Sequence, residues 1–381
     1  MASLLSRAGI MKIIFRVGAI LKMGLLSFAI MACGENEYGP ILSGESSSTR
    51  TDERLLVPAV PVTPAGQTVS VLSTGDAADD VAIWVHPTDL SRSLILGTDK
   101  QYGLFVFDLA GREVQRLRLG RLNNIDILPR RDGVHSFAVA SNRSSNSVTI
   151  LRIDSRTGLL RRWKDIPTEE LEPYGICATT DRDQNLVAIT YKNGMVQILE
   201  LVFEGVRVSP SLYRALEFGG QVEGCVFDED AGRLFVGEES QGIWVVEYRD
   251  SDSTPYLIDS VDSSSGLVAD VEGLAIWRGT NGRGWLVASA QGRDAFMLYD
   301  RQPPHRPQGV FRIEATTELD IDAVTHTDGI DITSAALPGF PRGLLVVQDD
   351  NEGGINQRQN FKFVHWGDIE SALNLPLFDQ D

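Results

Sequence analysis

Oxygen-bearing side chains recur along this sequence at a nearly constant spacing, each just before or within a short apolar segment. The intervals between successive members are 44, 50, 49, 49 and 56 residues. Carboxylate, amide and phenol oxygens, without histidine or cysteine, are ligands for hard divalent cations, and calcium accepts about six to eight of them in flexible geometry. The recurring residues are Asp80, Asn124, Tyr174, Glu223, Glu272 and Asp328, with further acids nearby at Asp79, Asp126, Asp270 and Asp331.

Carboxylates that crowd at one place repel one another and acquire raised pKa values, and shared cations remove that repulsion. The pattern therefore predicts calcium sites built from this set. For any single acid the alternative is a hydrogen bond to a backbone amide of a neighbouring strand.

The segments that carry these residues predict a ring of small sheets. Strand-like apolar runs that end in an acid recur at intervals of 46, 46, 47 and 53 residues, and turn sequences such as Asn193-Gly194 separate many of the segments. Six repeats of about fifty residues, each with room for four strands, are typical of an all-β, six-bladed β-propeller. A pair of β-sandwiches or a β-helix would not repeat in this way. The first strand of each blade lines the central channel, so the oxygen-bearing side chains should form a ring there.

The amino-acid composition and net charge limit the kinds of molecule that this protein can bind. The chain has 381 residues, of which 43% are hydrophobic, and its 35 basic against 52 acidic residues give a net charge of −17. A globular protein is expected, and nonspecific nucleic-acid binding, which needs a basic surface, is excluded. An anionic substrate remains compatible with this charge if metal ions supply the positive charge. We expect a monomer.

The N-terminal segment has the pattern of an export signal. Residues 1–33 contain four basic residues, no acid and an apolar stretch that ends in Ile30-Met31-Ala32-Cys33, which is similar to the motif at which bacterial lipoproteins are lipidated. We expect a signal peptide over 1–33, lipid on Cys33, a flexible linker over 34–66 and the propeller over 67–375. The protein would then be exported and anchored to a bacterial outer membrane. The alternatives are a cleaved secretory signal, giving a periplasmic or secreted protein, and a retained anchor.

Several longer motifs resemble one known family. The run from Asp76 to Pro87, Asp-Ala-Ala-Asp-Asp-Val-Ala-Ile-Trp-Val-His-Pro, is similar to the opening motif of the β-propeller phytases, the calcium-dependent alkaline phytases of the 3-phytase type. The resemblance continues over about residues 67–370 in the family's order. Its other motifs are Thr98-Asp-Lys100, Leu122-Asn-Asn-Ile-Asp126, Ala140-Ser-Asn-Arg143, Tyr174-Gly175, Val222-Glu-Gly224, Val236-Gly-Glu-Glu239, Asp270-Val-Glu-Gly273, Ser289-Ala-Gln-Gly292, Thr327-Asp-Gly-Ile-Asp331 and Gln348-Asp-Asp-Asn351.

The resemblance implies calcium-dependent hydrolysis of the phosphomonoesters of myo-inositol hexakisphosphate (phytate), as the free anion or its calcium complex, by attack of a metal-activated water. It implies structural calcium at Asp328 and Asn351, and phosphate contacts from Lys100, Arg143 and Lys192. It implies a catalytic group of Lys100, Arg143, Tyr174, Lys192 and Glu239. The calcium cluster that it implies consists of Asp80, Asp126, Tyr174, Glu223, Glu239, Asp270 and Glu272.

Some positions depart from the family pattern. Gln101 and Asn193 stand where the family often has a lysine and a glutamate; these departures bear on the second phosphate subsite and leave the core calcium ligands in place. A non-catalytic calcium-binding propeller and a propeller hydrolase for another ester remain as alternatives. Cys177 and Cys225 are expected to be small buried apolar residues, with a disulfide between blades as the alternative.

Overall fold

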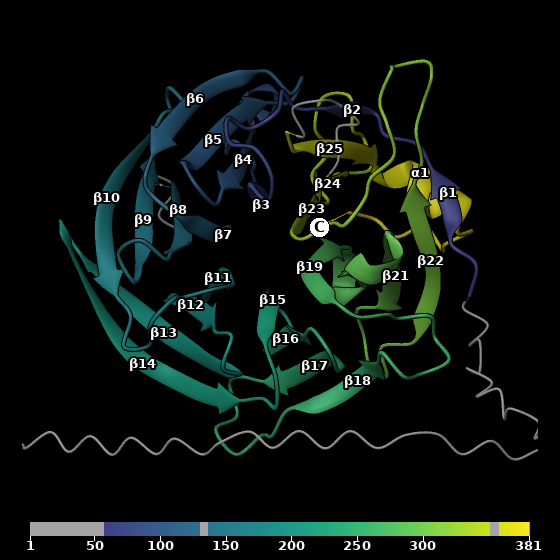
Figure 1. The fold of residues 1–381 in the computed structure, drawn as a ribbon. Helices are drawn as coiled ribbons and strands as arrows, with labels where there is room; N and C mark the ends of the chain where they lie inside the picture. The colour runs from purple at the N-terminus through teal and green to yellow at the C-terminus, as the bar shows by residue number, and fades with distance from the viewer. Residues whose placement is uncertain (1–56, 130–135, 351–357, 381) are drawn as a thin grey trace, which may run out of the picture. The chain divides into compact units, whose positions relative to one another are not determined.

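Six antiparallel sheets surround a central channel in the computed structural model, which describes residues 57–129, 136–350 and 358–380 (Figure 1). The predicted six-bladed β-propeller is confirmed. The innermost strands of the six sheets contact one another around the channel, in the order β3, β7, β11, β15, β19 and β23. Asn351 and the segment 1–33, with its expected lipid site Cys33, lie outside the described residues.

The first three blades each use four strands that follow one another in the chain. Blade 1 consists of β3 (Ala78–Trp84), β4 (Leu94–Asp99), β5 (Gly103–Asp108) and β6 (Glu113–Arg118). Blade 2 consists of β7 (Leu122–Leu128), β8 (Ser136–Asn142), β9 (Ser147–Ile153) and β10 (Leu160–Pro167). Blade 3 consists of β11 (Ile176–Asp181), β12 (Gln184–Thr190), β13 (Met195–Glu204) and β14 (Arg207–Glu217).

The other three blades follow the same plan, with additions from the ends of the chain. Blade 4 consists of β15 (Val222–Asp228), β16 (Arg233–Glu238), β17 (Gly242–Glu247) and β18 (Tyr256–Ser260). Blade 5 consists of β19 (Val271–Arg278), β20 (Gly284–Ala290), β21 (Ala295–Asp300) and β22 (Pro307–Ile313). Blade 6 contains β23 (Ile330–Thr333), β24 (Leu344–Asp349) and β25 (Asn360–His365), followed by helix α1 (Trp366–Ala372). Three 3-10 turns lie at η1 (Leu90–Arg92), η2 (Thr280–Gly282) and η3 (Gln291–Arg293).

Two N-terminal strands complete the ring. Strand β2 (Gly66–Gln67) pairs with β25 as the outermost strand of blade 6, and β1 (Val60–Val62) adds to blade 5 in parallel with β22. The expected linker over 34–66 therefore extends too far, because its last residues form sheet. The domain also continues past 375: the amide of Thr280 donates to the carbonyl of Asp379 at 2.8 Å.

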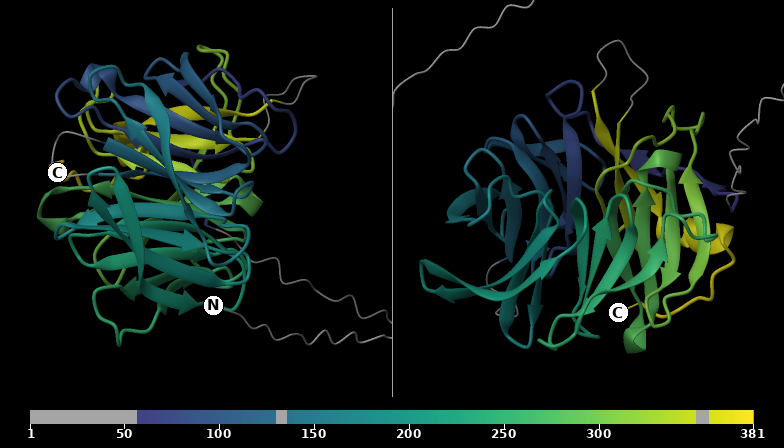
Figure 2. Two further views of the ribbon diagram at one scale, coloured as in Figure 1. Left: turned by 90° about the vertical axis from the view of Figure 1, so that its left-hand side faces the viewer. Right: turned by 60° about the horizontal axis from the view of Figure 1, so that its bottom comes forward.

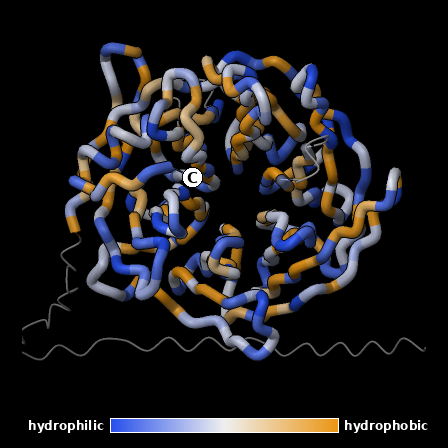
Figure 3. The backbone as a smooth tube through the Cα atoms, turned by 180° about the vertical axis from the view of Figure 1, so that it is seen from behind, coloured by the Kyte–Doolittle hydropathy of each residue, from blue (hydrophilic) through white to orange (hydrophobic). Residues whose placement is uncertain are grey.

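The hydrophobic core lies between the faces of neighbouring sheets. Strand β20 is buried on both faces and carries only apolar and small residues, whereas the equally buried β3 also carries the acids Asp79 and Asp80 near its start. Between blades 5 and 6, Trp277 stacks on Trp366 with ring centroids 5.7 Å apart. Hydrophobic and hydrophilic stretches alternate along the chain around the ring (Figure 3). The strands of each blade run between two loop-bearing ends (Figure 2). Among the described residues, no helix has the length and apolar character needed to span a membrane.

Cys177 and Cys225 form a disulfide between the inner strands of blades 3 and 4. The expectation of two separate buried side chains is wrong, and the alternative of a disulfide between blades is the one found. Both residues are as buried as expected. Their Cα atoms lie 5.8 Å apart, within the range that a disulfide requires.

A candidate metal and phosphate site at the channel mouth

Two sets of side chains meet at one end of the channel. The first set stands near the start of each innermost strand and is the recurring set of oxygen-bearing residues. The second set directly follows the second strand of a blade: Lys100 follows β4, Arg143 follows β8, Glu239 follows β16 and Gln291 follows β20, while Lys192 lies two residues after β12. Since equivalent positions of equivalent strands lie at one end of a propeller, the fold brings both sets together.

Hydroxyl groups on the second strands fix the backbone that carries the first set. Thr190 of β12 donates to the carbonyl of Glu223 in the next blade at 2.9 Å. Ser141 of β8 donates to the carbonyl of Tyr174. The same contact recurs from Thr98 to the carbonyl of Asn123 and from Ser289 to that of Thr327. The channel mouth is thus held by bonds between blades.

Three glutamates form the densest group of acids at the mouth. Glu223, Glu239 and Glu272 each place one carboxylate oxygen within 4.8 Å of the others. Tyr174 joins this cluster, because its hydroxyl lies 3.3 Å from Nε2 of Gln221 and the charge of Glu223, after burial, raises its pKa. The Gln221 amide also donates to Glu239. Blades 3, 4 and 5 therefore contribute to one group of oxygen ligands.

Burial and mutual repulsion raise the pKa values of these acids. Burial, and next the charge of Asp79, raises the pKa of Glu223 to about 7. Burial and then the charge of Glu223 raise the pKa of Glu272 well above its ordinary value, and burial also raises the pKa of Glu239. The pKa of Tyr174 is raised for the same two reasons, burial first. A divalent cation would replace the protons and relieve this repulsion.

Lys100 lies on the other side of the mouth, among carboxylates of blades 1 and 6. Its Nζ lies 2.6 Å from Asp76, 3.0 Å from Asp79 and 2.9 Å from Asp328. Burial favours the neutral amine, but the charges of Asp79 and Asp328 outweigh it and raise the pKa of Lys100. Lys100 is therefore a fixed positive charge.

Arg143 and Lys192 flank the glutamate cluster from blades 2 and 3. Nη1 of Arg143 donates to Oδ1 of Asn123 at 3.1 Å, and Asn123 donates to Oε1 of Glu223 at 2.8 Å. Nζ of Lys192 lies 4.2 Å from the ring centroid of Tyr174, a cation–π distance that leaves the ammonium able to reach an anion. Both cations thus contact groups that touch the acid cluster.

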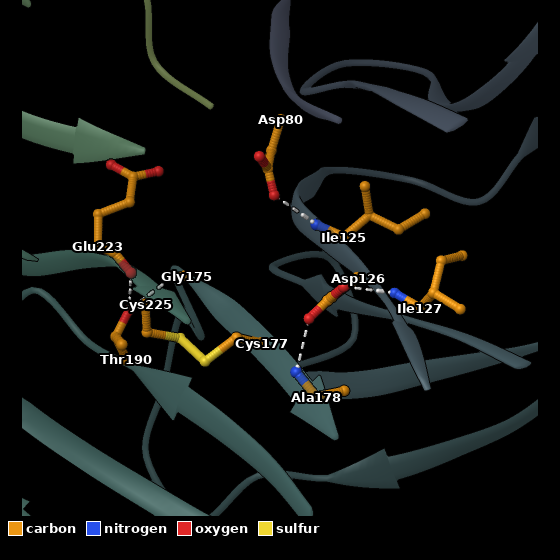
Figure 4. The surroundings of a disulfide bond; sticks show 10 residues. All are labelled: Asp80, Ile125, Asp126, Ile127, Gly175, Cys177, Ala178, Thr190, Glu223 and Cys225. Carbon is orange, nitrogen blue, oxygen red and sulfur yellow. Dashed lines mark hydrogen bonds between the residues drawn. A yellow bond between two sulfur atoms is a disulfide. The ribbon is translucent and has the colours of Figure 1, made fainter. Parts of the chain in front are cut away.

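Two residues of the implied calcium set accept hydrogen bonds from backbone amides of the next blade. Asp80 accepts a hydrogen bond from the amide of Ile125 at 3.0 Å, and Asp126 accepts one from Ala178 at 2.7 Å (Figure 4). Both line a cavity of about 360 Å³ inside the channel. Burial and the charge of Asp331 raise the pKa of Asp126 to about 8. Each of these carboxylates thus links two neighbouring blades through a hydrogen bond to a backbone amide. Such a bond is the alternative that the sequence leaves open for a single acid.

The other implied ligands have separate places. Asp270 is exposed and close enough to Glu239 that its charge raises the pKa of that group. Asp328 binds Lys100 and accepts a hydrogen bond from Gln291.

Sequence reasoning did not assign roles to Asn123, Gln221 or Gln291. Asn123 is next to Asn124 of the recurring set, Gln221 lies two residues before Glu223, and Gln291 is itself a second-set position. Each bonds to a mouth carboxylate. The signal was present, because Asn123 and Gln291 lie within the motifs that carry the family resemblance.

Comparison with known proteins gives the family. The family model described as phytase matches residues 40–380. The chain is 35% identical over 331 residues to the 3-phytase of Bacillus subtilis (strain 168), covering 82% of this chain and 85% of that protein. It also matches the crystal structure of a functionally unknown protein from Desulfotomaculum acetoxidans DSM 771, at 16% identity and a TM-score of 0.45, covering 64% of this chain and 74% of that one. On the family match and the Bacillus relative, this chain belongs to the phytase family.

Proposed function

We propose that this protein hydrolyses the phosphomonoesters of phytate and needs calcium to do so. As a member of the phytase family it is a phosphoric monoester hydrolase. The printed name of the Bacillus relative, 3-phytase, supports phytate as the substrate. The observation that carries the proposal is the cluster of Glu223, Glu239 and Glu272 with cations beside it.

The residues at the mouth fit calcium. All the candidate ligands are oxygens, which hard cations prefer. Oε2 of Glu272 and Oδ2 of Asp79 are buried and have no hydrogen-bond partner among the described residues, so each has an unused acceptor. When bound, calcium would polarise the phosphoryl oxygens and lower the pKa of a water for in-line attack.

The chain's own residues bind and orient the substrate. Arg143 can grip a phosphate with two parallel N–H groups, and Lys192 adds a point charge. Asn123 and Tyr174 hold these two cations against the acid cluster. The arrangement requires no covalent nucleophile from a side chain.

The proposal includes the location and state of the protein. We infer that it is exported, carries lipid on Cys33 and acts as a monomer on phytate or its calcium complex. The basic and apolar segment over 1–33 and its lipidation-like motif support export and lipidation.

Phosphate release from sodium phytate by the purified protein tests the function. Release should occur with added calcium and stop when a calcium chelator is present in excess. Equal release under both conditions would contradict the calcium requirement. No release under either would leave a non-catalytic propeller, while release only from other esters would favour a different hydrolase.

A further inference from the structure

The Cys177–Cys225 disulfide lies directly beneath the metal cluster. Cys177 follows Tyr174 by three residues on blade 3, and Cys225 follows Glu223 by two residues on blade 4. Figure 4 shows the bond crossing between the two inner strands, with the Glu223 carboxylate extending from the same strand as Cys225. The covalent link thus joins the two backbones that present Tyr174 and Glu223.

The two backbones are in close contact above the disulfide. The hydroxyl of Thr190 accepts from the amide of Gly175 at 2.9 Å and donates to the carbonyl of Glu223 at 2.9 Å. A Cβ added to Gly175 would lie 2.0 Å from the carbonyl oxygen of Glu223, so only glycine fits this approach. A small widening between the blades would therefore shift the Tyr174 hydroxyl relative to Glu223, whose charge acts on it.

Three other pairs of neighbouring inner strands are joined by hydrogen bonds instead of a covalent bond. A carboxylate on one inner strand accepts from an amide of the next: Asp331 from Ile83, Asp80 from Ile125 and Asp126 from Ala178. Between blades 3 and 4 the disulfide takes this place. A carboxylate there would add negative charge beneath Glu223, whereas a disulfide joins the strands without charge.

We propose that the Cys177–Cys225 disulfide positions Tyr174 against Glu223 and thereby sets the calcium affinity of the channel mouth. This inference rests on the proposed function, because it concerns the same metal cluster. The cysteines are positioning residues: they touch neither metal nor substrate, and they act through the two ligands above them.

The proposal separates calcium affinity from general stability. Loss of the bond should weaken calcium binding about tenfold, as losses of outer-shell support do, with a smaller change in kcat at saturating calcium. A role in stability alone would lower Tm and leave calcium affinity unchanged.

The test compares two variants of the full chain by calcium titration calorimetry and thermal unfolding. Cys177→Ala/Cys225→Ala removes the bond, and Leu151→Ala in β9 removes a fully buried side chain of blade 2 as a matched loss of stability. We expect the cysteine variant to bind calcium about tenfold more weakly than wild type, and the Leu151 variant to bind it as wild type does. Equal affinity in wild type and cysteine variant would overturn the inference while leaving the proposed function intact.

Chemical reduction of the disulfide in the wild-type protein tests the same inference without a mutation. Dithiothreitol supplies two electrons and two protons, which convert the disulfide into two thiols while the reagent forms its cyclic disulfide. Cys225 lines the channel cavity, which gives the reagent a path. Calcium affinity should fall on reduction and return on reoxidation. Unchanged affinity after complete reduction would contradict the inference, and absence of calcium binding by the oxidised wild type would overturn the proposed function and this inference with it.

Discussion

Glu272 offers the sharpest test of the metal cluster, because its Oε2 is buried and has no protein partner among the described residues. Glu272→Gln keeps the size of the side chain and removes its charge. We expect activity on phytate to fall by more than about 100-fold, since a neutral amide oxygen binds calcium more weakly than the charged carboxylate that it replaces. The calcium-free variant should unfold at a higher temperature than calcium-free wild type at pH 8, because one repelling charge is gone.

The matched control for this variant is Glu217→Gln on β14, an exposed glutamate on the outer strand of blade 3. Activity and Tm should both match wild type. Near-normal turnover in Glu272→Gln, measured as phosphate release at saturating calcium, would place the metal elsewhere.

The raised pKa of Glu223 gives a pH dependence with a definite sign. A carboxyl whose pKa is higher in the folded than in the unfolded protein favours folding while protonated. That stability is present below about 4.5 and is lost as the pH rises through about 7. Calcium-free protein should therefore show a lower Tm at pH 8 than at pH 5.

Calcium should reverse this trend, because binding requires the deprotonated carboxylates. Activity at a fixed, limiting calcium concentration should accordingly fall as the medium becomes acidic. Thermal unfolding across this range, with and without calcium, checks the sign, and a strictly acidic optimum for activity would contradict a calcium mechanism.

At the scale of strands, the repeat in the sequence predicts which end of each inner strand carries the site. It places Tyr174, Glu223 and Glu272 at one mouth because equivalent residues of a propeller share a level. It does not predict where a side chain points within that level. Asp80 and Asp126 each direct one carboxylate oxygen to a backbone amide of the neighbouring inner strand, a contact that residue type and spacing alone do not specify.

The sequence also did not predict pairings between segments that are far apart in the chain. Polar and small residues over 60–67 have the composition of a linker, yet blades 5 and 6 have strand edges that these residues can pair with. Cys177 and Cys225 are 48 residues apart, about one blade repeat, so they lie on neighbouring inner strands. Whether they form a disulfide depends on how closely these two strands approach, which the spacing does not determine.

The N-terminal strands should contribute stability through ring closure. A chain that begins at Thr68 lacks β1 and β2, leaving an edge of β25 unpaired and removing Val62 from the core. We expect its Tm to fall by several degrees, whereas a chain that begins at Val57 should match the longer protein. Differential scanning calorimetry measures both, and equal Tm values would show that blade 6 needs no outer strand.

The carboxylate of Asp331 joins the last blade to the first. It accepts from the amide of Ile83 at 2.7 Å and from that of Ile332 at 2.7 Å. Asp331→Ala leaves the Ile83 amide without a partner and should cost about 1–3 kcal/mol in unfolding free energy. Asp331→Asn keeps an acceptor oxygen and should cost less. Urea unfolding would measure both, and equal losses would argue against the hydrogen bond as the cause.

For the whole molecule, the expected lipid on Cys33 has a direct test. Full-length protein expressed in a bacterium should partition into the detergent phase of a cloud-point extraction, and Cys33→Ser should move it to the aqueous phase. The activity per molecule should be the same in both, because the site lies in the propeller. Aqueous partition of the wild type would instead favour a cleaved secretory signal.

The pairing of β2 with β25 has a consequence for the order in which this chain can fold. Strand β2 precedes every blade in the sequence, but its partner β25 follows five complete blades. Strand β2 therefore cannot pair with β25 until almost all of the polypeptide has been synthesised. The ring therefore cannot close until the last strand of blade 6 has been made.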